Sequence, residues 1–216
     1  MLSWISSYIG GPTVLMFIAA LIGAAGALWA AREQTVSERE LKKKNEEIVE
    51  LSRQIAYSLT GGNSYCYLVF SLHPESPLAR LNIVHAGQFP LYDVSVRIVD
   101  LDKFETVVKS KARSNYRLTY ADLEEAQQAF TIGNVKPGQA GDLGDWPMPK
   151  SREARYNVFF SARNGLFEEC VRIKRIDGKW VSAYRVERRQ GDKLETLYEK
   201  IDPTFPRDKD GKVSWD

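Results

Sequence analysis

The chain has 216 residues, 44% of them hydrophobic, and a formal net charge of +2. This hydrophobic content is that of a folded protein and excludes a disordered chain, and the length allows one domain of ordinary size with additional segments. The small net charge gives no support to a nucleic-acid-binding protein, so we expect nucleic acid not to be a partner.

An uncharged apolar segment lies near the start of the chain, at residues 12–31. Twenty residues of α-helix rise about 30 Å, which is the thickness of a bilayer hydrocarbon core. The segment lacks the polar face of a core helix, and residues 1–31 contain no Lys or Arg, with which a signal peptide would start. We therefore favour a transmembrane helix. The alternatives are a cleaved signal, for which Ala25-Gly26-Ala27 offers a cleavage-like pattern, and a buried or interfacial helix.

The flanks of this segment predict its orientation. Trp4 and Tyr8 in a short N-terminal segment, residues 1–11, and Trp29 near the other end are typical interfacial aromatic residues. The basic residues all follow the span: Arg32, Arg39, Lys42, Lys43, Lys44 and Arg53. The positive-inside rule then places the N-terminus outside and the C-terminal domain in the cytosol, as in a single-pass protein of the bacterial inner (cytoplasmic) membrane.

Small residues recur at every fourth position of the span. They form two rows: Ala19, Gly23 and Ala27, and Ala20 and Ala24. This spacing lets helix backbones approach closely in lipid and predicts self-association. The alternative is that Ala and Gly are merely tolerated there.

Residues 32–60 predict a charged helical stalk. The apolar residues near heptad a and d positions are Leu41, Ile48, Leu51 and Ile55. They indicate either a short coiled coil that supports a homo-oligomer or a stripe that packs on the following domain. Lys42–Lys44 could contact anionic lipid headgroups or simply be solvated. Gly61-Gly62 ends the helix and marks the domain boundary.

A β-rich domain is predicted for residues 61–206, with a C-terminal tail at 207–216. The expected strands are 64–72, 79–86, 91–101 and 130–135, and one short helix is expected at 119–129. The turn-rich residues 136–150 are expected to form a long surface loop.

Residues 154–188 predict a three-stranded antiparallel meander. Asn164-Gly165 and Asp177-Gly178 are type I′ turn signals. The second turn pairs Val171 with Tyr184, Ile173 with Ser182 and Glu169 with Val186. The first pairs Val158 with Val171, Tyr156 with Ile173 and Phe160 with Glu169. One face is then apolar, with Glu169 expected at its rim, and the other carries Arg155, Arg172, Lys174 and Arg185 with Phe159 and Cys170.

Several short strands with frequent turns suggest a mainly β fold, an antiparallel β-sandwich with one inserted helix. "LNIVHAGQFPLYDVSVRIVDL" (81–101) resembles the strand, Gly turn and strand signature of bacterial immunoglobulin-like sandwich domains, and "FTIGNVKPGQ" resembles the strand and Pro-Gly turn found later in them. The resemblance covers roughly 30 residues and implies a fold, not a catalytic site.

Residues with catalytic or ligating chemistry are few. We interpret His73 and His85 as surface or satisfied side chains, and Cys66 and Cys170 as buried free thiols in a reducing compartment. We expect no metal, no cofactor and no enzymatic activity. The basic residues Arg155, Arg172, Lys174 and Arg185 could bind a small anionic ligand or form a solvated face.

Two functions are compatible with these features. The first is a membrane-anchored, self-associating scaffold that presents a cytosolic sandwich to a protein partner. The second is a ligand-gated membrane effector of the antiviral, phage-defence type, in which the sandwich senses a nucleotide and controls the spans.

Overall fold

The computed structural model describes residues 12–74, 76–113, 117–191 and 193–215. The elements run in the order α1 (Pro12–Thr60), β1 (Tyr65–Ser71), β2 (Leu78–Ala86), β3 (Leu91–Asp100), α2 (Leu101–Arg113), α3 (Tyr120–Glu124), β4 (Gln127–Val135), β5 (Ala140–Pro147), β6 (Glu153–Ala162), β7 (Gly165–Ile176), β8 (Lys179–Gln190) and β9 (Lys193–Ile201). The expected segment 1–11, with Trp4 and Tyr8, lies outside the described residues. The chain divides into two compact units at Ile55 and Ala56.

The first unit contains most of α1. The predicted span and stalk form one continuous helix, because no Pro interrupts residues 13–60. Its apolar part is exposed along its length and is, by length and hydropathy, one candidate membrane span among the described residues. The helix is therefore consistent with a single-pass membrane protein.

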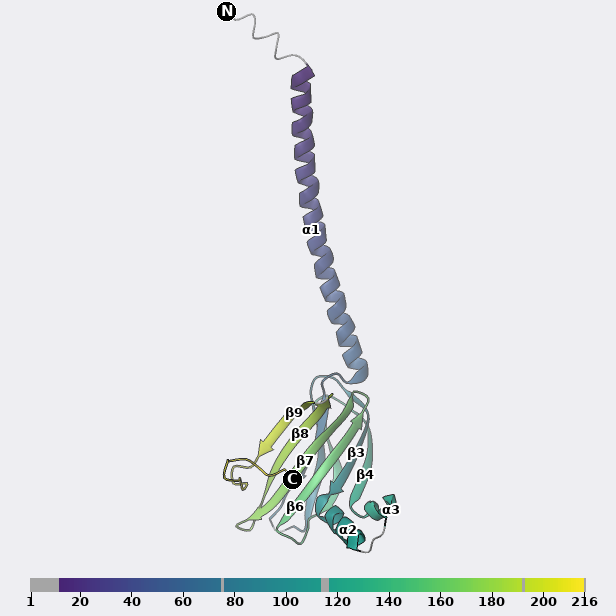
Figure 1. The fold of residues 1–216 in the computed structure, drawn as a ribbon, viewed down its shortest axis with the longest axis vertical. Helices are drawn as coiled ribbons and strands as arrows, with labels where there is room; N and C mark the ends of the chain where they lie inside the picture. Colours follow the sequence, from purple (N-terminus) through teal and green to yellow (C-terminus); the bar gives the residue numbers. More distant parts are fainter. Residues whose placement is uncertain (1–11, 75, 114–116, 192, 216) are drawn as a thin grey trace, which may run out of the picture. The chain divides into compact units, whose positions relative to one another are not determined.

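The second unit is an antiparallel β-sandwich of two sheets. Among the described residues, β1-β2-β5 form a three-stranded sheet and β4-β3-β6-β7-β8-β9 form a six-stranded sheet (Figure 1). The inward side chains of both sheets make one core, which includes Leu68, Ile83, Val96, Tyr156 and Val171. The mainly β, two-sheet fold expected from the sequence is confirmed.

The meander is formed by β6, β7 and β8. At the second turn, Asp177 and Gly178 have φ values of 47° and 81°, as a type I′ turn requires, and the predicted pairing of β7 with β8 is confirmed. The predicted inner face is also buried.

The predicted first turn of the meander is wrong. Tyr156, not Val158, lies opposite Val171, and Ala162 pairs with Gly165 around a turn formed by Arg163 and Asn164. Only Gly165 has a positive φ in this turn, so it is not type I′. Each partner moves by two residues, which leaves the same side chains on the inner face because successive residues alternate between faces.

Three other expectations about the domain need correction. Helix α3 stops at Glu124, because residues 127–129 pair with β3 and start β4. A second inserted helix, α2, follows β3 directly, so the domain has more than one helix. The expected loop 136–150 contains β5, in which Gly144 adopts φ +97° near a register shift and Trp146 is 8% exposed.

The two cysteines are buried and free, as expected. Burial raises the pKa of the Cys66 thiol to about 12. Cys66 therefore stays protonated at neutral pH and behaves as a small apolar core residue rather than as a nucleophile.

Candidate functional site

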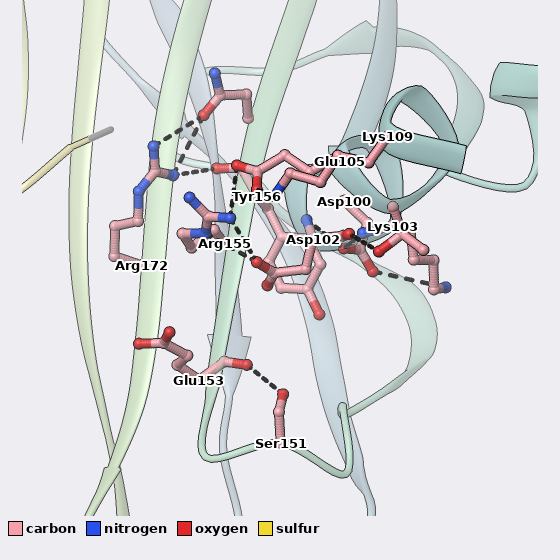
Figure 2. Close-up of polar contacts among 12 residues, drawn as sticks. Asp100, Asp102, Lys103, Glu105, Lys109, Ser151, Glu153, Arg155, Tyr156 and Arg172 are labelled. Atoms are coloured by element: carbon pink, nitrogen blue, oxygen red, sulfur yellow. Dashed lines mark hydrogen bonds and ion pairs between the residues drawn. The ribbon is translucent and has the colours of Figure 1, made fainter. Parts of the chain in front are cut away.

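The outer face of the six-stranded sheet carries three arginines on neighbouring strands. Arg155 of β6 lies directly opposite Arg172 of β7, and Arg185 of β8 lies opposite Cys170. Figure 2 shows Arg155 and Arg172 side by side, with Arg155 directed toward α2. Like charges that face each other across strands repel, so their surroundings decide whether the arrangement is stable.

Arg155 is neutralised by helix α2. Its Nη2 atom lies 2.7 Å from Asp102 Oδ1 and 2.8 Å from Glu105 Oε1. Helix α2 is oriented for these contacts by Asp100, whose Oδ1 atom accepts the backbone N–H groups of Asp102 and Lys103 as an N-cap. Arg155 therefore holds helix α2 against the sheet through ion pairs (Figure 2).

Arg172 is only 3% exposed although it lies on the outer face. Its Nη1 atom donates to the carbonyl oxygens of Tyr156 at 2.9 Å and Val171 at 3.0 Å and to Asn157 Oδ1 at 3.2 Å. Its Nη2 atom donates to Asn157 Oδ1 and to the Trp215 carbonyl. Burial lowers the pKa of Arg172, and the guanidinium groups of Arg155 and Arg185 act in the same direction.

The C-terminal segment covers this part of the sheet. Phe205 and Val213 are buried against Val181 and Ala183 of β8. The Arg185 guanidinium carbon lies 4.7 Å from the centre of the Trp215 ring. The segment expected to be a tail is thus packed on the sheet beside β8 (Figure 1).

Arg185 and Lys174 each make an ion pair on this face. Arg185 Nε lies 3.2 Å from Glu187 Oε1, and Lys174 Nζ lies 3.2 Å from Glu153 Oε2. All four basic residues singled out in the sequence thus lie on one face, and each already contacts protein groups. Binding of an anionic ligand there stays a prediction.

An apolar groove of about 540 Å³ occupies another part of the outer face. Its lining includes Phe159 and two exposed leucines, Leu166 and Leu194, which are 70% and 59% exposed. Glu168 and Glu187 add carboxylates, and Arg97 adds a guanidinium group 5.0 Å from the Phe159 ring centre. This volume and this mixture of apolar and polar groups are typical of a binding site.

Glu168 makes no close ion pair in the described part of the chain, although the charges of Arg189, Arg172 and Arg185 act to lower its pKa. Its Oε1 atom accepts one long hydrogen bond, 3.4 Å, from Asn157 Nδ2. Burial raises the pKa of Glu168, and the neighbouring Glu187 raises it further. A donor from a bound partner would stabilise this carboxylate.

A second pocket of about 490 Å³ lies beside α2. Its lining comprises Asp100, Asp102, Lys103, Thr106, Val107, Glu125, Pro149, Ser151, Ala154 and Tyr156. Burial raises the pKa of Tyr156 to about 12, so its hydroxyl stays protonated at neutral pH. The pocket can accept hydrogen-bonding groups but offers no activated nucleophile in this lining.

The groove was missed by the sequence reasoning. Alternation along β6 places Phe159 on the polar face, but the positions of Leu166 and Leu194 on that face depend on how β7 and β9 pair with their neighbouring strands. The residues expected to mediate oligomerisation all lie on α1 and are exposed: Ala19, Ala20, Gly23, Ala24, Ala27, Leu41, Ile48, Leu51 and Ile55. Their role stays a prediction.

His85 is a satisfied buried histidine, as expected. Its Nε2 atom lies 2.8 Å from the Phe89 carbonyl oxygen, and its Nδ1 atom accepts the Gly138 N–H group at 3.4 Å. Within the described ranges, three or more His, Cys, Asp or Glu side chains nowhere come together as a metal site would require. Comparison with models of known protein families, with characterised proteins and with solved structures finds no match to the chain.

Proposed function

We propose that this chain is a membrane-anchored, self-associating binding protein whose β-sandwich captures a protein partner. The observation that carries the proposal is the groove on the six-stranded sheet, where Leu166 and Leu194 are largely exposed beside Phe159. Exposed apolar surface that is concave and rimmed by polar groups is characteristic of interaction sites.

The partner is a protein segment that presents apolar side chains and one Lys or Arg. The apolar side chains would cover Phe159, Leu166 and Leu194, and the cation would pair with Glu168. This chemistry follows from the groove, because Glu168 is half-buried and is not neutralised by a close ion pair in the described part of the chain. An ion pair formed where water is excluded is stronger than the same pair at an open surface.

The sandwich is proposed to be immunoglobulin-like. In such domains the first, second and fifth strands share one sheet, and the third, sixth and seventh share the other. Here β1, β2 and β5 form one sheet, and β3, β6 and β7 are consecutive in the other. The fourth strand lies beside β3, and β8 and β9 extend the sheet beyond β7.

The span is proposed to lie in a bacterial inner membrane with the sandwich in the cytosol. The support is the candidate span in α1 and the basic residues that follow it. Protease added outside intact spheroplasts should then leave the sandwich undigested. Digestion of the sandwich would show that it lies outside the membrane and would contradict the proposed orientation.

Photo-crosslinking of the full-length protein in cells tests the groove. A photoreactive residue at Thr131, which is exposed and lines the groove, should give a protein adduct that disappears in the double variant Leu166→Asp, Leu194→Asp and weakens in Glu168→Gln. Leu118→Asp is the control, because Leu118 is exposed but lies outside the groove. Adducts to lipid alone, or an adduct that survives the double variant, would overturn the proposal.

A ligand-gated membrane effector is the second candidate. Its support is the arginine row of the sandwich together with the small-residue rows exposed on α1. Induction of the full chain should then collapse the membrane potential and stop growth, and removal of residues 1–31 should abolish both effects. If membrane potential and growth do not change, the effector function is rejected and the binding protein proposed first remains.

A further inference from the structure

Arg172 is a buried cation bonded only to neutral oxygen atoms in the described part of the chain. Its partners are three backbone carbonyls and the Asn157 side chain. Its Nε atom is buried and has no hydrogen-bond partner among the described residues. Asp102 acts on Arg172 through its charge and makes no ion pair with it, so an anion that binds Arg172 directly would stabilise the buried guanidinium group.

Arg185 supplies a second guanidinium group at the same place. Trp215 contacts both arginines, and the charge of Arg185 contributes to lowering the pKa of Arg172. Arg155 and Lys174 are paired with carboxylates of α2 and with Glu153. Arg185 also pairs with Glu187, at 3.2 Å, but Arg185 and Arg172 are the two basic residues that Trp215 contacts among the described residues. The anion-binding groups are therefore Arg172 and Arg185.

Trp215 covers both arginines. Its carbonyl oxygen accepts from Arg172 Nη2, and its ring lies over the Arg185 guanidinium. Trp215 itself is partly exposed, and the nearest buried anchor of its segment is Val213. Release of Trp215 from the arginines would therefore leave Phe205 and Val213 packed on β8.

We propose that Arg172 and Arg185 form a phosphate-binding site that Trp215 covers. A phosphate group replaces the Trp215 carbonyl at Arg172 and takes the place of the indole ring at Arg185. Guanidinium groups suit this ligand, because their planar N–H groups bind phosphate oxygens in pairs. The site is separate from the groove and deepens the second proposed function, because Arg172 and Arg185 belong to the arginine row on which that function rests.

Titration of the full-length protein in neutral-lipid nanodiscs tests the site. Inorganic pyrophosphate is the free-phosphate probe, and phosphatidylglycerol nanodiscs, compared with phosphatidylcholine nanodiscs, are the headgroup probe. Calorimetry should show pyrophosphate binding that Arg185→Gln weakens about tenfold or more, since hydrogen bonds to charged groups contribute about 1.5–3 kcal/mol. A variant that ends at Ser214 should bind more tightly, because the cover is gone.

Lys174→Gln is the matched control, since it removes one positive charge from the same face without touching the site. It should leave pyrophosphate binding within about twofold. If the site takes headgroups, phosphatidylglycerol should compete with pyrophosphate in the wild type and not in Arg185→Gln; without competition the ligand is a free phosphate. Absent binding, equal losses in Arg185→Gln and Lys174→Gln, or no gain in the shortened variant would overturn the proposal.

Discussion

Glu169 of β7 and Leu68 of β1 join the two sheets, because Glu169 Oε2 accepts the Leu68 backbone N–H group at 2.7 Å. β1 is an edge strand of the three-stranded sheet and has backbone groups that no neighbouring strand satisfies. Glu169 is fully buried, whereas the sequence placed it at the rim of the apolar face. Its carboxyl is stabilised in the core because it accepts one of these backbone N–H groups, that of Leu68.

Glu169 should make stability depend on pH. Burial raises the pKa of this carboxyl well above its ordinary value of 4.5. Between pH 4.5 and the folded-state pKa, the folded protein keeps a proton that the unfolded chain loses, so stability falls as pH rises. Because glutamine cannot titrate, Glu169→Gln should make the thermal unfolding midpoint less dependent on pH over this range. Parallel pH profiles for variant and wild type would show that Glu169 is not the cause.

Tyr184→Phe should destabilise the sandwich by about 1–3 kcal/mol. The Tyr184 hydroxyl accepts the Phe70 N–H group at 3.2 Å and donates to the Phe70 carbonyl at 3.4 Å, so its removal leaves buried backbone groups unpaired. Urea unfolding of the full chain in detergent, followed by tryptophan fluorescence, measures the change. Tyr120→Phe is the control, because Tyr120 is 67% exposed, and should change stability little.

Gly87→Ala should be more destabilising than Gly133→Ala. Both residues have positive φ, +115° and +79°, so both substitutions carry a backbone penalty of about 1–2 kcal/mol. Only at Gly87 would the new Cβ lie 2.5 Å from Ser64 Oγ and 2.7 Å from Ser64 Cα. Since Ser64 is 1% exposed and cannot easily move, a further loss of about 1–3 kcal/mol is expected in the same urea measurement. Equal losses at the two positions would contradict this packing.

Gly23→Leu should weaken self-association of the span. Gly23 is central in the row formed with Ala19 and Ala27, and a leucine there would keep two helix backbones apart. Ala25→Leu is the control, because at 100° per residue Ala25 lies roughly opposite this row. Analytical ultracentrifugation in detergent should show smaller species for Gly23→Leu only. Identical sedimentation of both variants and the wild type would place the contact elsewhere.

The helix and the meander were predictable because their signals are local. Residues 12–31 are uncharged, and Asp177-Gly178 specifies a turn that sets the register of β7 and β8. The register of β6 was missed because Asn164 is held by a distant partner: its side-chain amide donates to the carbonyls of Gly62 and Ser64. The sequence near residue 164 does not indicate this contact.

The sites were less predictable than the fold. The basic face could be inferred from alternation along the strands, but the burial of Arg172 depends on Trp215, which is 43 residues away in sequence. Strand β5 was mistaken for a loop, because its glycines suit turns and its pairing with β2 is non-local. Local pattern gives the face on which a side chain lies, whereas its exposure depends on what later parts of the chain cover.

The interrupted register of the outermost strands has a consequence if, as proposed, the chain is anchored in a membrane. The pairing of β9 with β8 shifts between Val186 and Glu187, and that of β4 with β3 shifts near Val94. Copies gathered in a bilayer meet at high local density, where straight open edges would recruit one another into fibrils. Edges bent by a register shift pair less readily with the edge of another copy. The domains could then be concentrated at a membrane without aggregating through their edge strands.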